Sequence, residues 1–373
     1  MSQVEFPHAN ATPDDLRFME AAIRLARRNK GLTGTNPSVG TIIVRDGIIV
    51  GRGVTAIGGR PHSEPQALAD AGEAARGATA YVTLEPCAHH GRTPPCAEAL
   101  VQAGIARVFV AATDPDERVS GNGFAILREA GIEVVPGILS EKAADDLAGY
   151  LNRSSKKRPE VILKLALSAD GFIGKKGEGQ VAITGPNARA QSHILRSQTD
   201  VILVGVETAI ADDPILNCRL PGLEQRSPVR LVLDSGLKLP LDSKLIRSSD
   251  AVPLWLSCCE HVAPERRYEM QAAGCRIIAA ESDEGRIALP ELMDDLAAQG
   301  ISSVLVEGGA NVASSFLKEN LVDRVVLFRS PVEIGSAAGV AVTDLQSHIA
   351  NEFAIVREAR YGDDAYAEYV RKT

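Results

Sequence analysis

The sequence predicts an α/β protein made of two domains, and three observations support this prediction. Helical and β-strand patterns alternate from the N-terminal region onward, at the spacing that parallel strand pairs require. Residues 152–159, NRSSKKRP, have the composition of a linker, and the alternation restarts after them. The length of 373 residues is enough for two ordinary cores. We therefore expect one domain at residues 1–153 and a second at residues 158–373.

The first domain opens with a helix that carries strong N-terminal signals. Residues 12–15, TPDD, supply an N-cap, a proline at the first helical position and an acid at the third, and we expect Gly31 to end the helix. The Asp-Gly pair at 46–47, between apolar runs at 41–45 and 48–50, predicts a β-hairpin. The remaining elements are expected as strands at 80–84, 108–111 and 133–135 and as helices at 64–71, 95–104 and 123–130.

The second domain repeats the alternation and ends in a hairpin. Strands are predicted at 161–167, 200–206, 229–233, 253–257, 276–279, 303–306 and 324–328, and helices at 266–273, 290–299 and 311–319. Gly362 and Asp363 form the turn of a last hairpin within residues 353–370. This pattern predicts a second sheet that again contains parallel strand pairs.

Composition and charge exclude several classes of function. Hydrophobic residues make up 45% and charged residues 24% of the chain, its mean hydropathy is -0.01, and no apolar run reaches the roughly 20 residues that span a bilayer. The first residues show no secretory signal, so we expect a cytoplasmic protein whose six cysteines form no disulfide framework. The net charge of -8 argues against a nucleic-acid partner.

One group of residues predicts a catalytic zinc site. His62 and Glu64 are separated by one residue, and Cys87 and Cys96 follow, each directly after a proline. Zinc deaminases hold the metal with one imidazole and two thiolates, leave the fourth position open for water, and use a carboxylate that is not a ligand to move the proton. Their usual motif is H-x-E followed by P-C-x-x-C, whereas eight residues separate the two cysteines here. Cys96 lies at a predicted helix start, where the helix dipole favours a thiolate.

The insert between the two cysteines, residues 88–95, is rich in histidine and arginine. His89, His90 and Arg92 could bind a phosphate group of the substrate, and His90 and Arg92 could instead be metal ligands or structural residues. A solvated loop is the remaining alternative. The residues alone leave these alternatives open.

The region around the cysteines resembles a known family. Residues 83–96, TLEPCAHHGRTPPC, resemble the deaminase domain of the bifunctional riboflavin biosynthesis enzymes, the RibD/RibG family. Residues 36–40, NPSVG, resemble the N-P-x-V-G motif of that family. Asp114 with Pro115, followed by residues 121–123, GNG, resembles its D-P…G-x-G loop.

This resemblance implies the fold and the roles of the first domain. The fold should be a cytidine-deaminase-like three-layer α/β/α domain. His62, Cys87 and Cys96 should hold zinc, and Glu64 should accept and donate the proton. The family's usual metal motif reads H-A-E, whereas this chain has Ser63 in place of the alanine. A serine is small and its side chain need not touch zinc, so we expect the same site.

A second signal lies at residues 303–314, SVLVEGGANVAS, which predict a strand, a glycine pair and a helix start. Free N–H groups at such a helix start can bind a cofactor phosphate. Residues 164–171, 183–186, 208–219 and 234–235 come in the order seen in the reductase domain of the same family. The resemblance therefore covers nearly the whole chain and implies a dihydrofolate-reductase-like α/β domain in the second half.

The resemblance also implies the residues of a reductase site. The nicotinamide cofactor should contact Ala166, Ala182, Thr208, Asp212, Ser235, Gly309, Ala310, Asn311, Val312, Ala313, Ser314 and Ser315. The phosphoribosyl substrate should contact Gly179, Arg196, Leu216, Arg219 and Glu307. The family commonly has a tryptophan at position 182, so the alanine implies that no indole stacks on the cofactor in this chain.

Two pairs of ionisable residues in this domain allow more than one interpretation. Arg196 and Arg219 suit a phosphate, which a guanidinium binds with two hydrogen bonds, and a surface salt bridge is the alternative. Lys164 and Asp170 are the ionisable candidates near the hydride transfer, and a structural salt bridge explains them equally well.

The resemblance implies two consecutive reactions on a small-molecule substrate. The first is zinc-dependent hydrolytic deamination of 2,5-diamino-6-(5-phosphoribosylamino)pyrimidin-4-one, and the second is NADPH-dependent reduction of the ribosyl group to a ribityl chain. We expect no membrane or nucleic-acid partner and a homo-oligomer.

Two other interpretations compete with this one. A cytidine or tRNA-adenosine deaminase with an unrelated appendage is opposed by the acidic net charge and by the cysteine spacing. A structural zinc protein is opposed by Glu64, because a closed structural site needs four protein ligands and no proton carrier.

Overall fold

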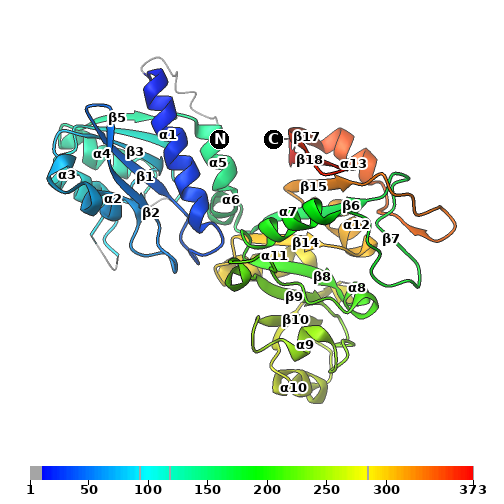
Figure 1. Cartoon of the computed structure of the whole chain (residues 1–373). Helices are drawn as coiled ribbons and strands as arrows, with labels where there is room; N and C mark the ends of the chain where they lie inside the picture. The colour runs from blue at the N-terminus through cyan, green and yellow to red at the C-terminus, as the bar shows by residue number, and fades with distance from the viewer. Residues whose placement is uncertain (1–10, 92–93, 117–118, 284, 373) are drawn as a thin grey trace. The chain divides into compact units, whose positions relative to one another are not determined.

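The computed structural model describes residues 11–91, 94–116, 119–283 and 285–372. The chain divides into two compact units, Met1–Lys157 and Arg158–Thr373, each with its own sheet (Figure 1). Among the described residues, no helix is both long enough and apolar enough to cross a membrane.

The first unit is built on a five-stranded sheet with the order β2-β1-β3-β4-β5. Its strands are β1 (Gly40–Arg45), β2 (Ile48–Val54), β3 (Thr79–Leu84), β4 (Arg107–Ala112) and β5 (Glu133–Pro136). β1 pairs antiparallel with β2 and β3, whereas β3, β4 and β5 are parallel. The predicted hairpin is confirmed, because Asp46 and Gly47 both adopt the positive φ angles that such a tight turn requires.

Helices cover both faces of this sheet. They are α1 (Pro13–Ala26), α2 (Ser63–Ala71), α3 (Cys96–Gln102), α4 (Asn122–Glu129), α5 (Ser140–Asp146) and α6 (Ala148–Lys156). The helices α2, α3 and α4 pack side by side on one face, and α1 with α5 covers the other (Figure 1). Thr12 forms the expected capping box with Asp15 at the start of α1. The result is the predicted three-layer arrangement around one apolar core.

The structure differs from the sequence-based expectation at two helix ends in this unit. The first helix ends at Ala26 and not at Gly31, because a 3₁₀ turn over Arg27–Asn29 follows it. Residues 152–156 of the predicted linker belong to α6. Ser155 and Lys156 lie on the solvent side of this amphipathic helix, while Tyr150 and Leu151 pack against the core.

The second unit contains a nine-stranded sheet with the order β11-β10-β9-β8-β14-β6-β15-β18-β17. Its strands are β6 (Glu160–Leu167), β8 (Val201–Gly205), β9 (Val229–Leu233), β10 (Leu254–Cys259), β11 (Arg276–Ala280), β14 (Ser303–Glu307), β15 (Arg324–Arg329), β17 (Phe353–Tyr361) and β18 (Asp364–Arg371). All neighbouring strands are parallel except two pairs, β15 with β18 and β17 with β18. The strands β17 and β18 form the predicted C-terminal hairpin, which lies at one edge of the sheet. Two small sheets pair β7 (Gly174–Lys175) with β16 (Gly339–Val340) and β12 (Ser282–Asp283) with β13 (Arg286–Ile287).

Helices also cover both faces of this second sheet. They are α7 (Pro186–Arg196), α8 (Val206–Asp212), α9 (Lys244–Arg247), α10 (Pro264–Ala272), α11 (Leu289–Ala298), α12 (Ala310–Lys318) and α13 (Leu345–Glu352). The helices α11, α12 and α13 share a core with one face of the central strands, and α7, α8, α9 and α10 pack on the other face. The central strands are buried on both sides and are therefore apolar almost throughout, as in β8.

The helices α7, α8, α9 and α13 were not predicted from the sequence, and one predicted strand is too long. The helix α7 buries only Ala188 and Ser192, so its pattern lacks the large apolar residues that mark a helix facing the core. The strand predicted to reach Val206 ends at Gly205, because α8 begins at Val206.

The order of the strands places three loops at one point of the sheet. After β6, the strands β8, β9, β10 and β11 follow one another outward to one edge of the sheet. The next long strand along the chain, β14, is then inserted between β8 and β6. The carboxyl ends of these parallel strands therefore meet where the strand order reverses, at Gly205, Glu307 and Leu167. Such a switch point is where open α/β sheets commonly bind their ligands.

Candidate functional site

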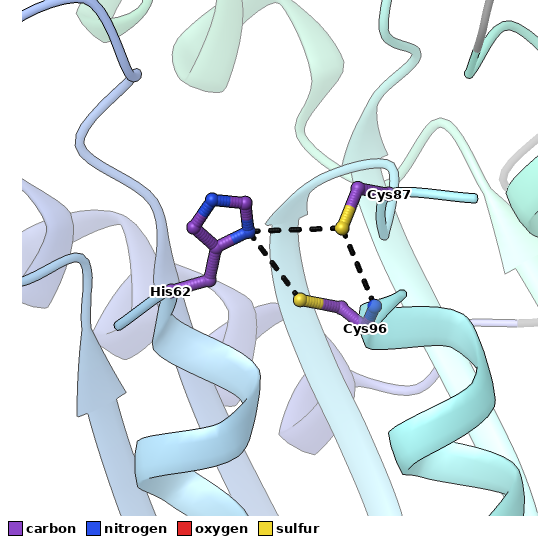
Figure 2. Close-up of side chains that lie close together, drawn as sticks. All are labelled: His62, Cys87 and Cys96. Atoms are coloured by element: carbon purple, nitrogen blue, oxygen red, sulfur yellow. Dashed lines mark hydrogen bonds between the residues drawn. The ribbon is translucent and has the colours of Figure 1, made fainter. Parts of the chain in front are cut away.

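The three predicted metal ligands meet at one point of the first unit. The Nδ1 atom of His62 lies 3.7 Å from the Cys87 sulfur and 3.4 Å from the Cys96 sulfur (Figure 2). One ligand atom from each of the three residues lies within 4.8 Å of the others. One imidazole and two thiolates form the donor set that catalytic zinc sites use, so these residues fit that ion.

Helix starts hold two of these ligands. His62 is the N-cap of α2, and Cys96 is the first residue of α3. The backbone N–H of Cys96 donates to the Cys87 sulfur at 3.3 Å, and this hydrogen bond joins the turn after β3 to the start of α3 (Figure 2). A side chain at Gly53 would lie 1.9 Å from the Ser63 carbonyl oxygen, so glycine is needed for β2 to approach the start of α2.

The electrostatic surroundings favour a thiolate in this cluster. The Cys96 thiol beside it lowers the pKa of Cys87, and His62 lowers it further. The thiolate is the form of cysteine that binds a metal ion. The same contact between the two cysteines, together with burial, raises the pKa of Cys96, so the surroundings favour one thiolate, that of Cys87.

Glu64 lies on the wall of a cavity that also contains His62 and Cys87. The cavity has a volume of about 280 Å³. The Glu64 side chain is 3% exposed, and burial followed by the neighbouring Cys87 raises its pKa. Its Oε2 atom accepts a hydrogen bond of 3.0 Å from Ser63. A buried carboxyl with a raised pKa can both accept and donate a proton, as a deamination requires.

The other walls of the cavity come from the motif loops and from α6. Asn36 and Asp114 line it, and the Tyr150 hydroxyl donates its single proton to the Asp114 carboxylate, whose two oxygens both lie 3.0 Å away. Tyr150 and Arg153 line it as well, although the sequence analysis assigned them no role. Arg153 donates to the carbonyl oxygen of Thr35 and joins α6 to the loop that carries Asn36. The amphipathic face of α6 is the signal that could have identified them.

The insert between the cysteines contributes one histidine to the cavity. His89 lines it, whereas His90 is exposed and bonds to Glu98 at 3.1 Å. His90 therefore lies outside the ligand cluster. Arg92, the remaining candidate of the insert, lies outside the described residues.

A glycine pair follows β14 at the switch point of the second sheet. Gly308 and Gly309 both have positive φ angles, and Gly309 is the N-cap of α12. A Cβ atom at position 309 would lie 2.9 Å from the Thr208 hydroxyl oxygen, so the two predicted cofactor-binding segments approach closely. Position 205 is equally restricted, because a Cβ there would lie 2.8 Å from Val312. A helix start with free N–H groups and no side chain in the way fits a cofactor phosphate.

The predicted substrate residues Arg196 and Glu307 form an ion pair. Arg196 Nε lies 2.7 Å from Glu307 Oε1 and Nη2 lies 2.9 Å from Oε2, while Nη1 donates to the Asn217 carbonyl oxygen at 3.0 Å. Lys164 Nζ lies 3.7 Å from the same carboxylate. Burial alone would raise the pKa of Glu307, but Arg196 and Lys164 outweigh it and lower the pKa to about 2. The Arg196 guanidinium is thus largely occupied by protein partners.

Arg219 is the more accessible of the two predicted phosphate-binding arginines. Its side chain is exposed and donates to the Asn217 side-chain oxygen at 3.0 Å. Its backbone N–H lies 3.4 Å from Nδ1 of His193, a residue that the sequence analysis assigned no role. His193 stands one helical turn before Arg196 on α7, and that spacing is the signal that links them.

The remaining predicted positions lie along the same edge of the sheet or pack below it. Ala166 and Ser235 are close to the carboxyl ends of β6 and β9, and Gly179 lies beside the last turn of α8, near Asp212. Leu216 is buried with a positive φ. Ala182 is exposed in a segment without regular structure. Along α12, Ala310, Asn311, Val312, Ser314 and Ser315 are accessible to different degrees, whereas the Ala313 side chain packs in the core.

Asp170 joins two loops at this edge. Its carboxylate accepts hydrogen bonds from the Ser168 hydroxyl at 2.6 Å and from the backbone N–H groups of Ile334 at 3.1 Å and Gly335 at 2.7 Å. The bond from Ser168 makes the largest contribution to lowering the pKa of Asp170 to about 2. These contacts favour the structural alternative for Asp170 over proton donation.

Comparisons with protein families match both halves of the chain. Residues 12–112 match the cytidine and deoxycytidylate deaminase zinc-binding region, and residues 159–364 match the RibD C-terminal domain. The riboflavin biosynthesis protein RibD of Aquifex aeolicus is 38% identical over 346 residues, which are 93% of this chain and 94% of the relative. RibD of Escherichia coli is 37% identical over 335 residues, which cover 87% of this chain and 89% of the relative.

Solved structures agree with these matches over the full length. A structure of Acinetobacter baumannii RibD has a TM-score of 0.85 and 35% sequence identity, and the match covers 96% of this chain and 99% of that one. A Thermotoga maritima diaminohydroxyphosphoribosylaminopyrimidine deaminase/5-amino-6-(5-phosphoribosylamino)uracil reductase has a TM-score of 0.83 and 31% identity, with coverages of 96% and 98%. The predicted fold class is confirmed for both domains.

Proposed function

Because the chain belongs to the RibD family of bifunctional riboflavin biosynthesis enzymes, we propose how its residues divide the two reactions between them. The enzyme combines a zinc-dependent deaminase domain with an NADPH-dependent reductase domain. It deaminates 2,5-diamino-6-(5-phosphoribosylamino)pyrimidin-4-one and then reduces the ribosyl group to a ribityl chain. The assignment of individual residues and of the domain limits at 1–153 and 158–373 is our proposal.

In the deaminase domain, we propose that His62, Cys87 and Cys96 hold zinc. A zinc ion held by these residues would lower the pKa of a bound water molecule and so supply a nucleophile near neutral pH. Glu64 then takes the proton from the attacking water and passes it to the departing amine. The observation that carries this proposal is that the three ligand atoms lie within 4.8 Å of one another and that Glu64 lines the same cavity.

In the reductase domain, we propose that NADPH binds at the turn from Gly309 to Ser315 with Thr208, and that it supplies the hydride. The accessible Arg219 binds the substrate phosphate, while Arg196 holds the Glu307 carboxylate toward the ribosyl group. Lys164 is the group we propose for the proton that must accompany the hydride. Support for this choice comes from its buried ammonium beside Glu307 and from the engagement of Asp170 in loop contacts.

The remaining predicted positions complete this proposal. Ala166, Ala182, Asp212 and Ser235 contact the cofactor, and Gly179 and Leu216 contact the substrate. We further propose a cytoplasmic homo-oligomer, which light scattering and cell fractionation would test.

Product analysis with the phosphoribosylamino-diaminopyrimidine, with and without NADPH, tests the order of the two activities. We expect ammonia release without NADPH, and NADPH oxidation only after deamination. NADPH oxidation that precedes ammonia release would contradict this order. A cytidine or tRNA deaminase would instead release ammonia from free cytidine or from tRNA, and a structural zinc protein would release none.

A further inference from the structure

Two buried hydroxyl groups form a hydrogen-bonded row that leads to Glu64, the proposed proton carrier. Thr41 on β1 and Ser63 at the start of α2 are both fully buried. Their oxygen atoms are 2.7 Å apart, and the Ser63 oxygen lies 3.0 Å from Oε2 of Glu64. Glu64 lines the cavity of the zinc cluster, whereas neither hydroxyl residue does. The three side chains therefore form a row that ends at the cavity wall.

The direction of these hydrogen bonds follows from proton counting. In its ionised form, which takes the proton, the Glu64 carboxylate can only accept, so the single hydroxyl proton of Ser63 points to Glu64. The Ser63 oxygen can then only accept from Thr41, whose own proton completes the contact. Hydrogen bonds aligned in one direction strengthen each other in a buried environment.

The backbone holds this row in place. Thr41 lies on a strand that is paired on both sides, with Gly53 of β2 opposite it on one side and Val82 of β3 on the other. The Ser63 carbonyl oxygen lies against Gly53, where no side chain would fit. The backbones of both hydroxyl residues are therefore held by the packing of β1, β2 and α2, and this ties the position of Glu64 Oε2 to the centre of the fold.

We propose that Ser63, supported by Thr41, is a positioning residue for deamination in this chain. Its hydroxyl fixes the orientation of Oε2, so that the Glu64 carboxyl is held in place for proton exchange in the cavity. The inference rests on the role of Glu64 proposed above. It concerns a feature particular to this sequence, because serine stands where the motif usually has alanine.

The test compares the zinc-loaded full chain with the Ser63→Ala, Thr41→Val and double variants. For Ser63→Ala we expect kcat of deamination to fall about tenfold and KM to change less than about twofold, because substrate binding does not involve the lost bond. For Thr41→Val we expect a fall of about threefold. The double variant should match Ser63→Ala, because Thr41 acts only through Ser63.

Two controls separate positioning from stability. Thr83→Val removes another buried hydroxyl of the same core, which accepts a hydrogen bond from the Gly40 N–H and not from the Ser63–Glu64 row. We expect this variant to lose stability but to keep the deamination kcat. The reductase rate of each variant with deaminated substrate serves as an internal reference. A crystal structure of zinc-loaded Ser63→Ala should show the Glu64 carboxylate turned from its original orientation.

Each outcome decides the inference separately from the proposed function. If the unaltered chain releases no ammonia, the deaminase assignment itself fails. Wild-type kcat in Ser63→Ala, with Glu64→Gln inactive, would overturn the positioning role and leave Glu64 in place. Independent, multiplicative effects of Ser63→Ala and Thr41→Val would overturn the shared row. If Ser63→Ala loses zinc, its kcat no longer tests the inference and Thr41→Val takes its place. An unchanged deamination kcat in Thr41→Val would then overturn the inference.

Discussion

Glu64 in the deaminase domain and Glu307 in the reductase domain are both buried, and the surroundings of the two carboxyl groups are opposite. Glu64 of the deaminase domain is 3% exposed and pairs with no lysine or arginine among the described residues. Burial, followed by Cys87, raises its pKa. Glu307 of the reductase domain is 9% exposed, but Arg196 and Lys164 outweigh its burial and lower its pKa to about 2.

This difference shows how the surroundings give two glutamates of one chain different roles. A carboxyl group that must take up and release a proton needs surroundings in which both forms are accessible. A carboxylate that must stay ionised needs fixed cations beside it. Zinc with two thiolates and a neutral imidazole carries no net charge, so metal binding adds no permanent cation for Glu64.

Replacing the carboxyl group of Glu64 should give the largest effect on activity. We expect Glu64→Gln to reduce deamination at least about a hundredfold, because an amide cannot carry the proton. Zinc content and the reduction of deaminated substrate should stay the same, since the ligands and the second domain are unchanged. Ammonia release measured beside metal analysis tests this, and full turnover in the variant would refute the proton-carrier role.

Replacing Glu307 should give the largest effect on stability. We expect Glu307→Gln to cost about 3–5 kcal/mol in the free energy of unfolding of the reductase domain, because two buried cations lose their counter-ion. Trp255, the single tryptophan of the chain, lies in β10 of this domain and reports its unfolding by fluorescence. Glu352→Gln, in a partly exposed ion pair with Arg371, is the matched control and should cost about 1 kcal/mol or less.

Acid should remove the stabilisation by Glu307, and the sign follows from its pKa. The pKa in the folded chain is about 2, below the ordinary value of 4.5, so the folded state binds its proton less readily. The stabilisation is complete above the ordinary value and is lost as pH falls through it toward 2. Stability of Glu307→Gln should depend less on pH in this window, and an equal dependence would show that other groups dominate.

The two sites also differ in how far the sequence predicts them. His62 and Cys96 lie within one stretch of 35 residues, so their spacing and the expected helix starts predict the cluster. The bond from Ser63 to Glu64 is different, because it depends on Thr41, which reaches Ser63 only through the pairing of β1 with β2 and the packing of α2. Local motifs therefore predict the ligands but not the residue that supports Glu64.

Long-range ion pairs explain most of what the sequence could not predict in the reductase domain. Arg196 and Glu307 are 111 positions apart, and their contact depends on β14 entering the sheet beside β8. Resemblance predicts both as substrate contacts but not that they bind each other. In the first domain, Arg153 lies within the charged stretch that was predicted as a linker, and Tyr150 lies just before it. Both residues reach the cavity because α6 packs against the domain.

The loop contact of Asp170 offers a smaller effect on the reductase side. We expect Asp170→Asn to raise the KM for NADPH about threefold, because an amide nitrogen cannot accept from the N–H groups of Ile334 or Gly335 and the loops lose order. Deamination should be unchanged. Steady-state kinetics of NADPH oxidation measure the effect, and an unchanged KM would mean that the loops keep their order without this carboxylate.

The smallest predicted effect concerns His193, which lies near Arg196 and Arg219, the two arginines of the proposed substrate site. Burial, followed by Arg196 and Arg219, lowers its pKa to about 4. Between this value and the ordinary 6.5 the unfolded chain binds more protons, so the contribution of His193 to stability falls as pH decreases through this range. Because the side chain is partly exposed, solvent screens the effect and we expect only a small change.

The variant His193→Gln cannot titrate, so its reductase domain should lose less stability than the unaltered domain between pH 7 and 5. In this window Glu307 is ionised in both the folded and the unfolded chain, so its titration does not interfere. Urea unfolding followed by Trp255 fluorescence at both pH values measures the difference. Parallel losses in the two proteins would show that the arginines do not suppress protonation of His193. The contrast between the sites would then rest on Glu64 and Glu307 alone.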